Sequence, residues 1–283
     1  MIECTDKLFR LSTDHTAYLF RVTDFGHVEH LHYGGPVALS DADALGVKTT
    51  IARGSSILYD EGSDTYCLDD MALEWSGVGK GDFRNPPAEL ILPGGGYTND
   101  FLYDSYEIRT GPLPMEKLPT AYGDEAETLI LHLKEKAASV TLDLVYTVYP
   151  REDVIARRAV LKNGGEGPVV IDKLMSYMLD MMPAADLTFT TFDGGWIREA
   201  RRHDRPVASG IYVNEGSTGA SGHKHNPGVL LSEAHCAEEQ GRCWGFNLLY
   251  SGNHYTAVEK AENGLVRVMA GVSPRCFSFS LSA

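Results

Sequence analysis

The sequence predicts an all-β protein built as a large antiparallel β-sandwich, and three observations lead to this prediction. Roughly fifteen short runs alternate between apolar and polar residues, the period of a strand that buries one face. Clusters of Gly, Pro, Asn and Asp separate these runs, as turns do. No amphipathic run is convincing as a helix of more than two turns. Many short strands joined by turns are typical of sandwich folds.

Alternation is clearest in two segments. In residues 16–22, Tyr18 and Phe20 fall at every second position and share a face with Val22. In residues 139–149, Thr141 lies on a mainly polar face, while the opposite face holds only apolar side chains. That apolar face consists of Val140, Leu142, Leu144, Tyr146 and Val148. Residues 124–136 contain good helix formers, but their leucines alternate at positions 129, 131 and 133, which favours a strand.

Two hairpins are predicted from turn chemistry. The glycine-rich stretch 163–167 connects strand-like residues 157–162 and 169–177. Asn263-Gly264 connects residues 257–260 and 266–270, and both turn residues tolerate a positive φ. We therefore expect two antiparallel pairs at these places.

Composition limits the classes of function. The 283 residues suffice for one large all-β domain or two smaller ones, with 43% hydrophobic residues as in globular proteins. Lys and Arg number 25 against 39 Asp and Glu, a net charge of −14 that argues against nucleic acid as a partner. We find neither an apolar run of about 18 residues nor an export leader, so we expect no membrane contact and a cytoplasmic protein. The odd number of cysteines, five, without CxxC pairs, fits free thiols in a reducing compartment.

Residues 193–227 hold the first candidate contact surface. Gly194 and Gly195 allow a tight turn that presents Trp196, and Arg198 shares its face if the segment is extended. The loop 221–227 adds three polar side chains, namely His223, His225 and Asn226. We predict from this a surface for sugar or for another domain. The alternative is a core tryptophan beside a solvated arginine.

Residues 60–84 form an acidic, glycine-rich arm with little apolar periodicity. Trp75, Asp82 and Arg84 are its candidate contact residues, because such arms commonly carry binding groups. The alternatives are a solvated loop for the arm and, for Asp82, an ion pair with Arg84 inside the sandwich.

Metal and cofactor chemistry is not predicted. His27, His30 and His32 have a spacing that zinc accepts, but no cysteine lies nearby, and such histidines are more often hydrogen-bonded strand residues. Phosphate-binding glycine loops, H-E-x-x-H and G-x-S-x-G are missing from the sequence. We therefore expect no metal and no cofactor.

An ordered set of motifs resembles the N-terminal domain of family 36 glycoside hydrolases, the bacterial α-galactosidases. Departures are limited to single positions, such as Trp75, where the family more often has Tyr, and Gly228, where it usually has Phe. The matching motifs are Leu68-Asp69, Glu74-Trp75, Gly79-x-Gly-Asp-Phe-Arg84, Asp153-Val-Ile-x-Arg157, Asn163-x-Gly165, Leu179-Asp180, Gly195-Trp-x-Arg-Glu199, the loop 221–227, Leu249-Tyr-Ser-Gly-Asn253 and Arg267 with Gly271 and Pro274.

The resemblance implies a supersandwich of the galactose-mutarotase-like kind and a function divided between domains. The complete enzyme would cleave terminal α-galactosyl residues from sugars such as melibiose or raffinose, with two carboxylates on a barrel that this chain lacks. The surface around Trp196 and Arg198, with the loop 221–227, would contact that barrel. In the family's tetramers, the arm would help to build the substrate pocket of a neighbouring subunit.

The family's nucleophile lies in a Lys-Trp-Asp motif, and none of the three tryptophans, Trp75, Trp196 and Trp244, has these neighbours. We therefore expect residues 1–283 to be one N-terminal domain with an incomplete last strand and no activity of its own. The alternative is a free-standing carbohydrate-binding or assembly module with no catalytic partner.

Overall fold

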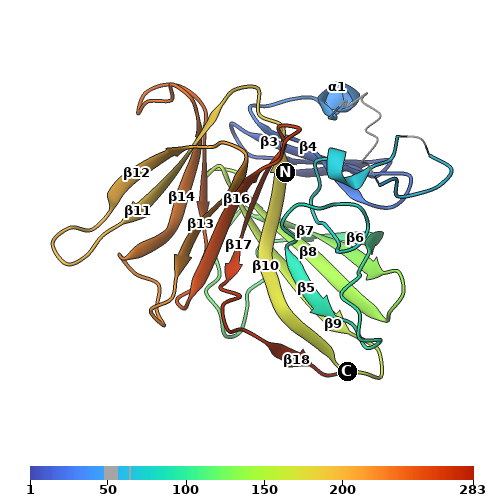
Figure 1. Cartoon of the computed structure of the whole chain (residues 1–283). Coiled ribbons are helices and arrows are strands. Elements are labelled where there is room, and N and C mark those ends of the chain that lie inside the picture. The colour runs from blue at the N-terminus through green and yellow to red at the C-terminus, as the bar shows by residue number, and fades with distance from the viewer. Residues whose placement is uncertain (48–56, 64) are drawn as a thin grey trace.

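The computed structural model describes residues 1–47, 57–63 and 65–283, and strands dominate this part of the chain. Its eighteen strands all pair antiparallel, which confirms the predicted all-β antiparallel fold (Figure 1). Among the described residues, no helix has the length and apolarity to span a membrane. The helical elements are η1 (Leu39–Asp41), α1 (Ala42–Leu45) and η2 (Leu68–Asp70).

Two of the four sheets follow chain order. The first consists of β1 (Ile2–Thr5), β2 (Leu8–Ser12), β3 (Ala17–Val22) and β4 (Val28–Gly34). The second consists of β6 (Phe101–Thr110), β7 (Glu127–Glu135), β8 (Val140–Tyr149) and β9 (Val154–Asn163). In both, each strand pairs with the next one along the chain, because short turns return the chain beside itself.

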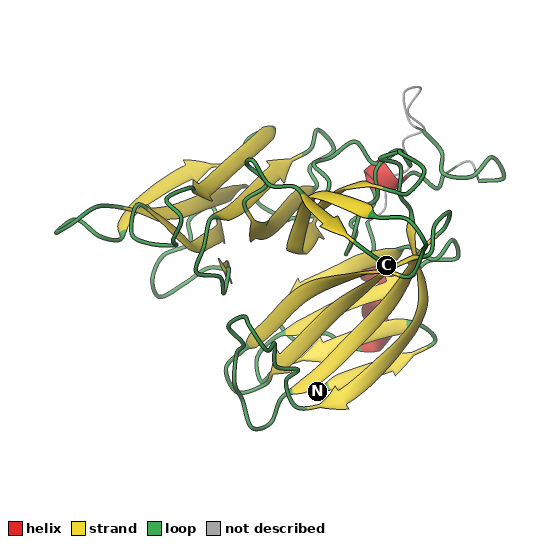
Figure 2. Ribbon diagram, turned by 90° about the horizontal axis from the view of Figure 1, so that it is seen from below, coloured by secondary structure: helices red, strands yellow, loops and turns green. Residues whose placement is uncertain are grey.

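The other two sheets depart from chain order. One runs β12 (Arg201–Pro206), β11 (Leu187–Asp193), β14 (His225–Glu233) and β15 (Cys243–Asn247). The last runs β13 (Gly210–Gly216), β16 (His254–Lys260), β17 (Val266–Val272), β10 (Val169–Met181) and β18 (Phe279–Leu281), with β5 (Ala88–Ile91) also on β10. Figure 2 shows the strands in two groups that are inclined to each other.

Strand β10 connects the parts of the molecule. Its C-terminal half pairs with β17, and its N-terminal half pairs with β5 and β18 (Figure 1). Val170 and Ile171 have partners in both β5 and β18, so these two strands lie on opposite sides of β10. The hairpin predicted at Asn263-Gly264 is confirmed, since β16 pairs with β17 and the turn contains Gly264 with φ +91°. The hairpin predicted across residues 163–167 is wrong, because β9 pairs with β8 and β10 belongs to another sheet, so this glycine-rich stretch connects two sheets.

One hydrophobic core is shared by the four sheets. Each sheet contributes buried side chains to the same cluster, for example Phe20 from β3, Leu144 from β8, Val268 from β17 and Phe189 from β11. Burying such a side chain contributes roughly 1.5–3 kcal/mol. The shared core therefore holds together sheets that are separate in their hydrogen bonding.

The alternation in β8 is confirmed. Its five predicted apolar side chains are all buried, and Leu144 faces Leu131 of β7 in register. The other face is less exposed than predicted, because β8 lies between β7 and β9. Asp143 on that face is buried against His132 and Lys162. Only Thr141, near the start of the strand, stays half-buried.

We expect Leu144→Asp to abolish soluble expression, because an unpaired carboxylate in the shared core costs a large part of a total stability of about 5–15 kcal/mol. Thr141→Asp, on the opposite face, should be mild. Yield of soluble protein and urea unfolding measure both variants, with Leu144→Met as a volume-conserving control of less than about 1.5 kcal/mol. Equal tolerance of aspartate at 141 and 144 would contradict the assigned face.

Candidate functional site

The tip of the β11–β12 hairpin presents two large apolar side chains to solvent. Trp196 is 82% exposed and Ile197 is 80% exposed. A Cβ at Gly194 would lie 2.2 Å from the carbonyl oxygen of Arg198, so only glycine permits this close return of the chain. The prediction that a glycine turn presents Trp196 is therefore confirmed, and the alternative of a core tryptophan is wrong.

The loop 221–227 lies beside this hairpin because β14 pairs with β11. The Asp193 carboxylate is 2.9 Å from Nδ1 of His225 and 3.7 Å from Nε2 of His203, which lies on β12. His223 is exposed. The two motifs, separated by some thirty residues in the sequence, thus form one surface with a carboxylate at its centre.

Asn226 is part of the backbone structure of that loop. Its side-chain oxygen accepts from the amide of Gly228 at 2.8 Å, and its carbonyl accepts from Asn214 Nδ2 at 2.7 Å. These bonds set the direction in which the loop enters β14. Through these two hydrogen bonds, Asn226 helps to fix the shape of the surface.

The arm candidates lie inside the protein. Trp75, Asp82 and Arg84 are all buried, and Asp82 Oδ1 accepts from Arg84 Nε at 2.8 Å. The ion-pair alternative for Asp82 is thus the arrangement that the structure adopts. Asp64, an acidic residue of the same arm, lies outside the described residues.

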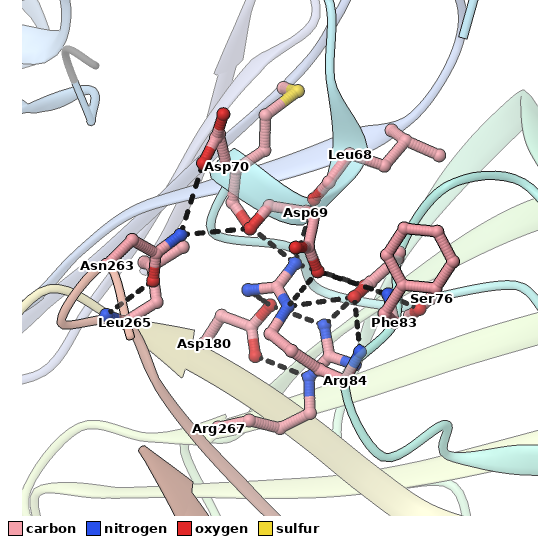
Figure 3. A network of polar contacts seen from close by, with 12 residues as sticks. Leu68, Asp69, Asp70, Ser76, Phe83, Arg84, Asp180, Asn263, Leu265 and Arg267 are labelled. Carbon is pink, nitrogen blue, oxygen red and sulfur yellow. Dashed lines mark hydrogen bonds and ion pairs between the residues drawn. The ribbon is translucent and has the colours of Figure 1, made fainter. Parts of the chain in front are cut away.

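Two further buried residues complete a network of four charges. Arg267 on β17 donates from Nη2 to Asp82 Oδ2 at 2.7 Å and from Nε to Asp180 Oδ1 at 2.7 Å. Arg84 Nη1 is 3.0 Å from Asp180 Oδ2 on β10. Figure 3 shows Arg84, Asp180 and Arg267 converging from three elements. Two arginines and two aspartates therefore neutralise each other where water is excluded.

The surrounding charges favour the ionised forms of Asp82 and Arg267. Burial alone would raise the pKa of Asp82, but the guanidinium groups of Arg267 and Arg84 outweigh it and hold the pKa well below its usual range. Burial alone would lower the pKa of Arg267, and the carboxylates of Asp180 and Asp82 raise it instead. With its pKa lowered in this way, Asp82 stays deprotonated and has no proton to donate.

Phe83 separates the two buried arm residues and points outward. It is 67% exposed, whereas Asp82 before it and Arg84 after it are buried. Its backbone amide donates to Asp69 Oδ1 at 3.1 Å (Figure 3). The charge quartet thus holds a loop that presents one aromatic ring, a residue that the sequence reasoning missed. The signal for its exposure that the sequence offered was its position between the two charged residues Asp82 and Arg84.

A second buried network surrounds Glu74. The carboxylate accepts from Tyr18 OH at 2.6 Å, from Tyr146 OH at 2.7 Å and from Arg157 Nη2 at 2.8 Å, and its Oε1 is 2.7 Å from His30 Nδ1. Burial would raise the pKa of Glu74, but Arg157 and these hydrogen bonds lower it from 4.5 to about 2. This network ties the arm to β3, β4, β8 and β9.

The histidines of the 27–32 segment use their nitrogens within the chain. His27 lies 2.9 Å from Tyr66 OH and 3.1 Å from Asp100 Oδ1, and His32 lies 2.9 Å from the carbonyl of Gly35. They are hydrogen-bonded strand and turn residues, which is the interpretation that the sequence favoured.

Comparison with known proteins gives a consistent result. The family model described as the glycosyl hydrolase family 36 N-terminal domain matches residues 26–282. A probable α-galactosidase C of Aspergillus oryzae is 32% identical over 98% of this chain and 36% of its own length. A bifunctional α-galactosidase/sucrose kinase of Mediterraneibacter gnavus is 34% identical over 98% of this chain and 30% of its own.

Solved structures agree over the whole chain. The galactosidase domain of an α-galactosidase–sucrose kinase superposes with a TM-score of 0.94 at 33% identity, covering 100% of this chain and 40% of its own. A family 36 α-galactosidase of Geobacillus stearothermophilus in complex with raffinose has a TM-score of 0.92 at 30% identity, covering 98% and 38%. The chain thus spans less than half the length of the proteins it resembles.

We expect Arg267→Met to destabilise the protein by about 3–5 kcal/mol, because it leaves Asp82 and Asp180 with one buried cation between them. Urea unfolding measures this loss. Arg275→Met is the matched control, since Arg275 pairs with Glu215 at the surface, where water screens the pair and its loss costs far less. Equal losses in the two variants would show that the quartet does not stabilise the fold.

The low pKa of Glu74 predicts a defined pH dependence. Its contribution is fully present above the unfolded pKa, near 4.5, and is lost as pH falls toward the folded pKa of about 2. The stability of the native protein should therefore rise across this window by a few kcal/mol more than that of Glu74→Gln, since one pKa unit corresponds to about 1.4 kcal/mol. Unfolding curves from pH 2 to 6 test this, with exposed Glu238→Gln as control. Parallel pH profiles for the native protein and Glu74→Gln would contradict it.

Proposed function

This chain belongs to the family of glycosyl hydrolase family 36 N-terminal domains, and on this premise we propose that it is the non-catalytic front part of an α-galactosidase. The observation that carries the proposal is the whole-chain superposition on α-galactosidases of the family, of which the chain covers about two fifths. The complete enzyme would hydrolyse terminal α-D-galactosyl residues of sugars such as melibiose or raffinose.

The state of the buried carboxylates supports assigning no catalytic role to this part. Retaining glycoside hydrolysis needs a general acid with a raised pKa and a nucleophile about 5–5.5 Å away. In Glu74 and Asp82 the pKa is lowered instead, and both accept hydrogen bonds from arginines. Asp180 is likewise paired with Arg267. The two catalytic carboxylates would come from a barrel domain of the same protein.

The exposed parts of the candidate site would serve contact. Trp196 and Arg198, with His223 and Asn226 beside them, would meet the barrel, because tryptophan and arginine contribute disproportionately at interfaces. The arm would meet a second subunit of a homo-oligomer and border its α-galactoside pocket. Within the arm, Phe83 makes the contact in this proposal.

The buried arm residues have an indirect part in the same proposal. Trp75, Asp82 and Arg84 would hold the loop that carries Phe83, so their effect on the contact passes through its position. The proposed compartment is the cytoplasm, which the five free cysteine thiols support.

We expect residues 1–283 alone to show negligible turnover of p-nitrophenyl α-galactoside. The complete protein, in the same assay, should reach the range common to enzymes, about 1–10³ s⁻¹. Turnover in that range by residues 1–283 would overturn the non-catalytic assignment, and an inactive complete protein would favour the free-standing module.

In the complete protein, Phe83→Ala should weaken subunit association or raise KM with a nearly unchanged melting temperature, because the ring is exposed. Asp82→Asn should instead lower the melting temperature, because it weakens the buried quartet. Sedimentation, kinetics and calorimetry separate the two effects, and Ile211→Ala, at an exposed position of β13, is the control. Unchanged assembly and kinetics in Phe83→Ala would remove the contact role of the arm.

A further inference from the structure

A long apolar groove separates β9 from the β14–β15 pair. Its volume is about 1010 Å³. One wall consists of residues 154–160 of β9 together with the loop 112–121, and the other consists of residues of β14 and β15 and the segment 248–250. Tyr18, Tyr177 and Leu179 line it between these walls. Asn226 of the candidate site also borders it.

Both strands beside the groove are the last of their sheets. Within the described part of the chain, β9 pairs with β8 alone and β15 with β14 alone. Each strand therefore has one row of backbone amide and carbonyl groups without a strand partner. Long edges of this kind promote aggregation when they stay open, so a stable protein covers them.

The side chains of β9 point to the same conclusion. The run Val154-Ile-Ala-Arg-Arg-Ala-Val-Leu161 is apolar except for its two arginines, a composition typical of a strand covered on both faces. In the structure, however, the first residue of this run is exposed and the other seven are only half-buried. On the rims, Leu118 and Leu249 are each 50% exposed.

The charged groups that line the groove all have partners within the chain. Arg157 donates to Glu74, Arg158 donates from Nη1 to the carbonyl of Leu113 at 2.9 Å, and Asp153 accepts from Thr13 Oγ1 at 2.7 Å. Arg158 Nε and the hydroxyl of Tyr177 are buried polar atoms of the lining that have no hydrogen-bond partner among the described residues. The lining is otherwise mainly apolar, so apolar contact dominates the selection of the occupant.

The volume lies at the upper end of small-molecule pockets, about 300–1,000 Å³, and sugar sites need several converging polar groups that are free to bind. A segment of protein fits both the length and the apolar lining better. The relatives supply its source, since the matching region is only 36% of one and 40% of a solved structure that aligns with the entire chain.

We propose that this groove is where the remainder of the same polypeptide docks, through a segment of its catalytic part that presents an apolar face to β9 and β15. The inference rests on the proposed function for the existence of that part. It goes further by assigning the docking surface, which places the Trp196 hairpin and the loop 221–227 at the edge of one continuous contact.

Photo-crosslinking in the complete protein tests the inference. p-Benzoylphenylalanine is placed at Leu118 or at Leu249, on opposite rims, and at Ile211 of β13 as an exposed control outside the groove. After irradiation and digestion, mass spectrometry should find both rim probes joined to peptides beyond residue 283. Mixing ¹⁴N- and ¹⁵N-labelled protein should show that these links stay within one chain, and the Ile211 probe should not reach the same peptides.

Rim probes that link only within residues 1–283, or between two labelled chains, would overturn the inference. Loss of the rim cross-links in the presence of methyl α-galactoside would assign the groove to sugar and would overturn it as well. Turnover of p-nitrophenyl α-galactoside is measured on the same samples. An active enzyme without the expected links refutes the docking surface alone, whereas an inactive protein with these links refutes the proposed function alone.

Discussion

The buried quartet of Asp82, Arg84, Asp180 and Arg267 is the constraint on which the arm depends. Its members come from the arm, from β10 and from β17, which are far apart in the sequence. Each charge is tolerable in the interior only because the others are present, and removing one leaves the rest uncompensated. Asp82 and Arg84, which lie outside the strands, are thereby tied to β17 and β10. The exposed position of Phe83 is a consequence of this arrangement.

The Glu74 network also fixes the arm to strands that are distant in the sequence. Its tyrosines and its arginine come from β3, β8 and β9, so one carboxylate connects two sheets that share no strand pairing. Such a group contributes specificity as well as stability, because only one register of the strands brings all its donors together. The motifs of residues 74–84, 157, 180 and 267, which resemble a glycosidase domain, are largely these buried charges. They report the fold of the domain, since their carboxylates are paired with arginines in the interior.

The exposed features form a different class. The Trp196 tip, Phe83 and the open edges of β9 and β15 place apolar groups where an isolated domain has no use for them. Large exposed apolar surfaces mark contacts with other proteins, and the relatives are more than twice as long as this chain. The domain thus combines buried charge networks, which fix its own loops, with exposed apolar surfaces, which are available for contact. Together they are consistent with the proposed role of a domain that supports a larger enzyme.

The sequence by itself determined the strands and several of their turns. Alternation in β8 and the Asn263-Gly264 turn are local properties, since side-chain period and tolerance of positive φ depend on neighbouring residues only. The Trp196 turn was predictable for the same reason. Whether Asp82 and Arg84 meet solvent or each other was decided by tertiary structure, because their outer partners, Asp180 and Arg267, arrive from other strands. The same holds for Phe83 and for the groove beside β9. Burial is a property of the assembled sheets, and no local pattern contains it.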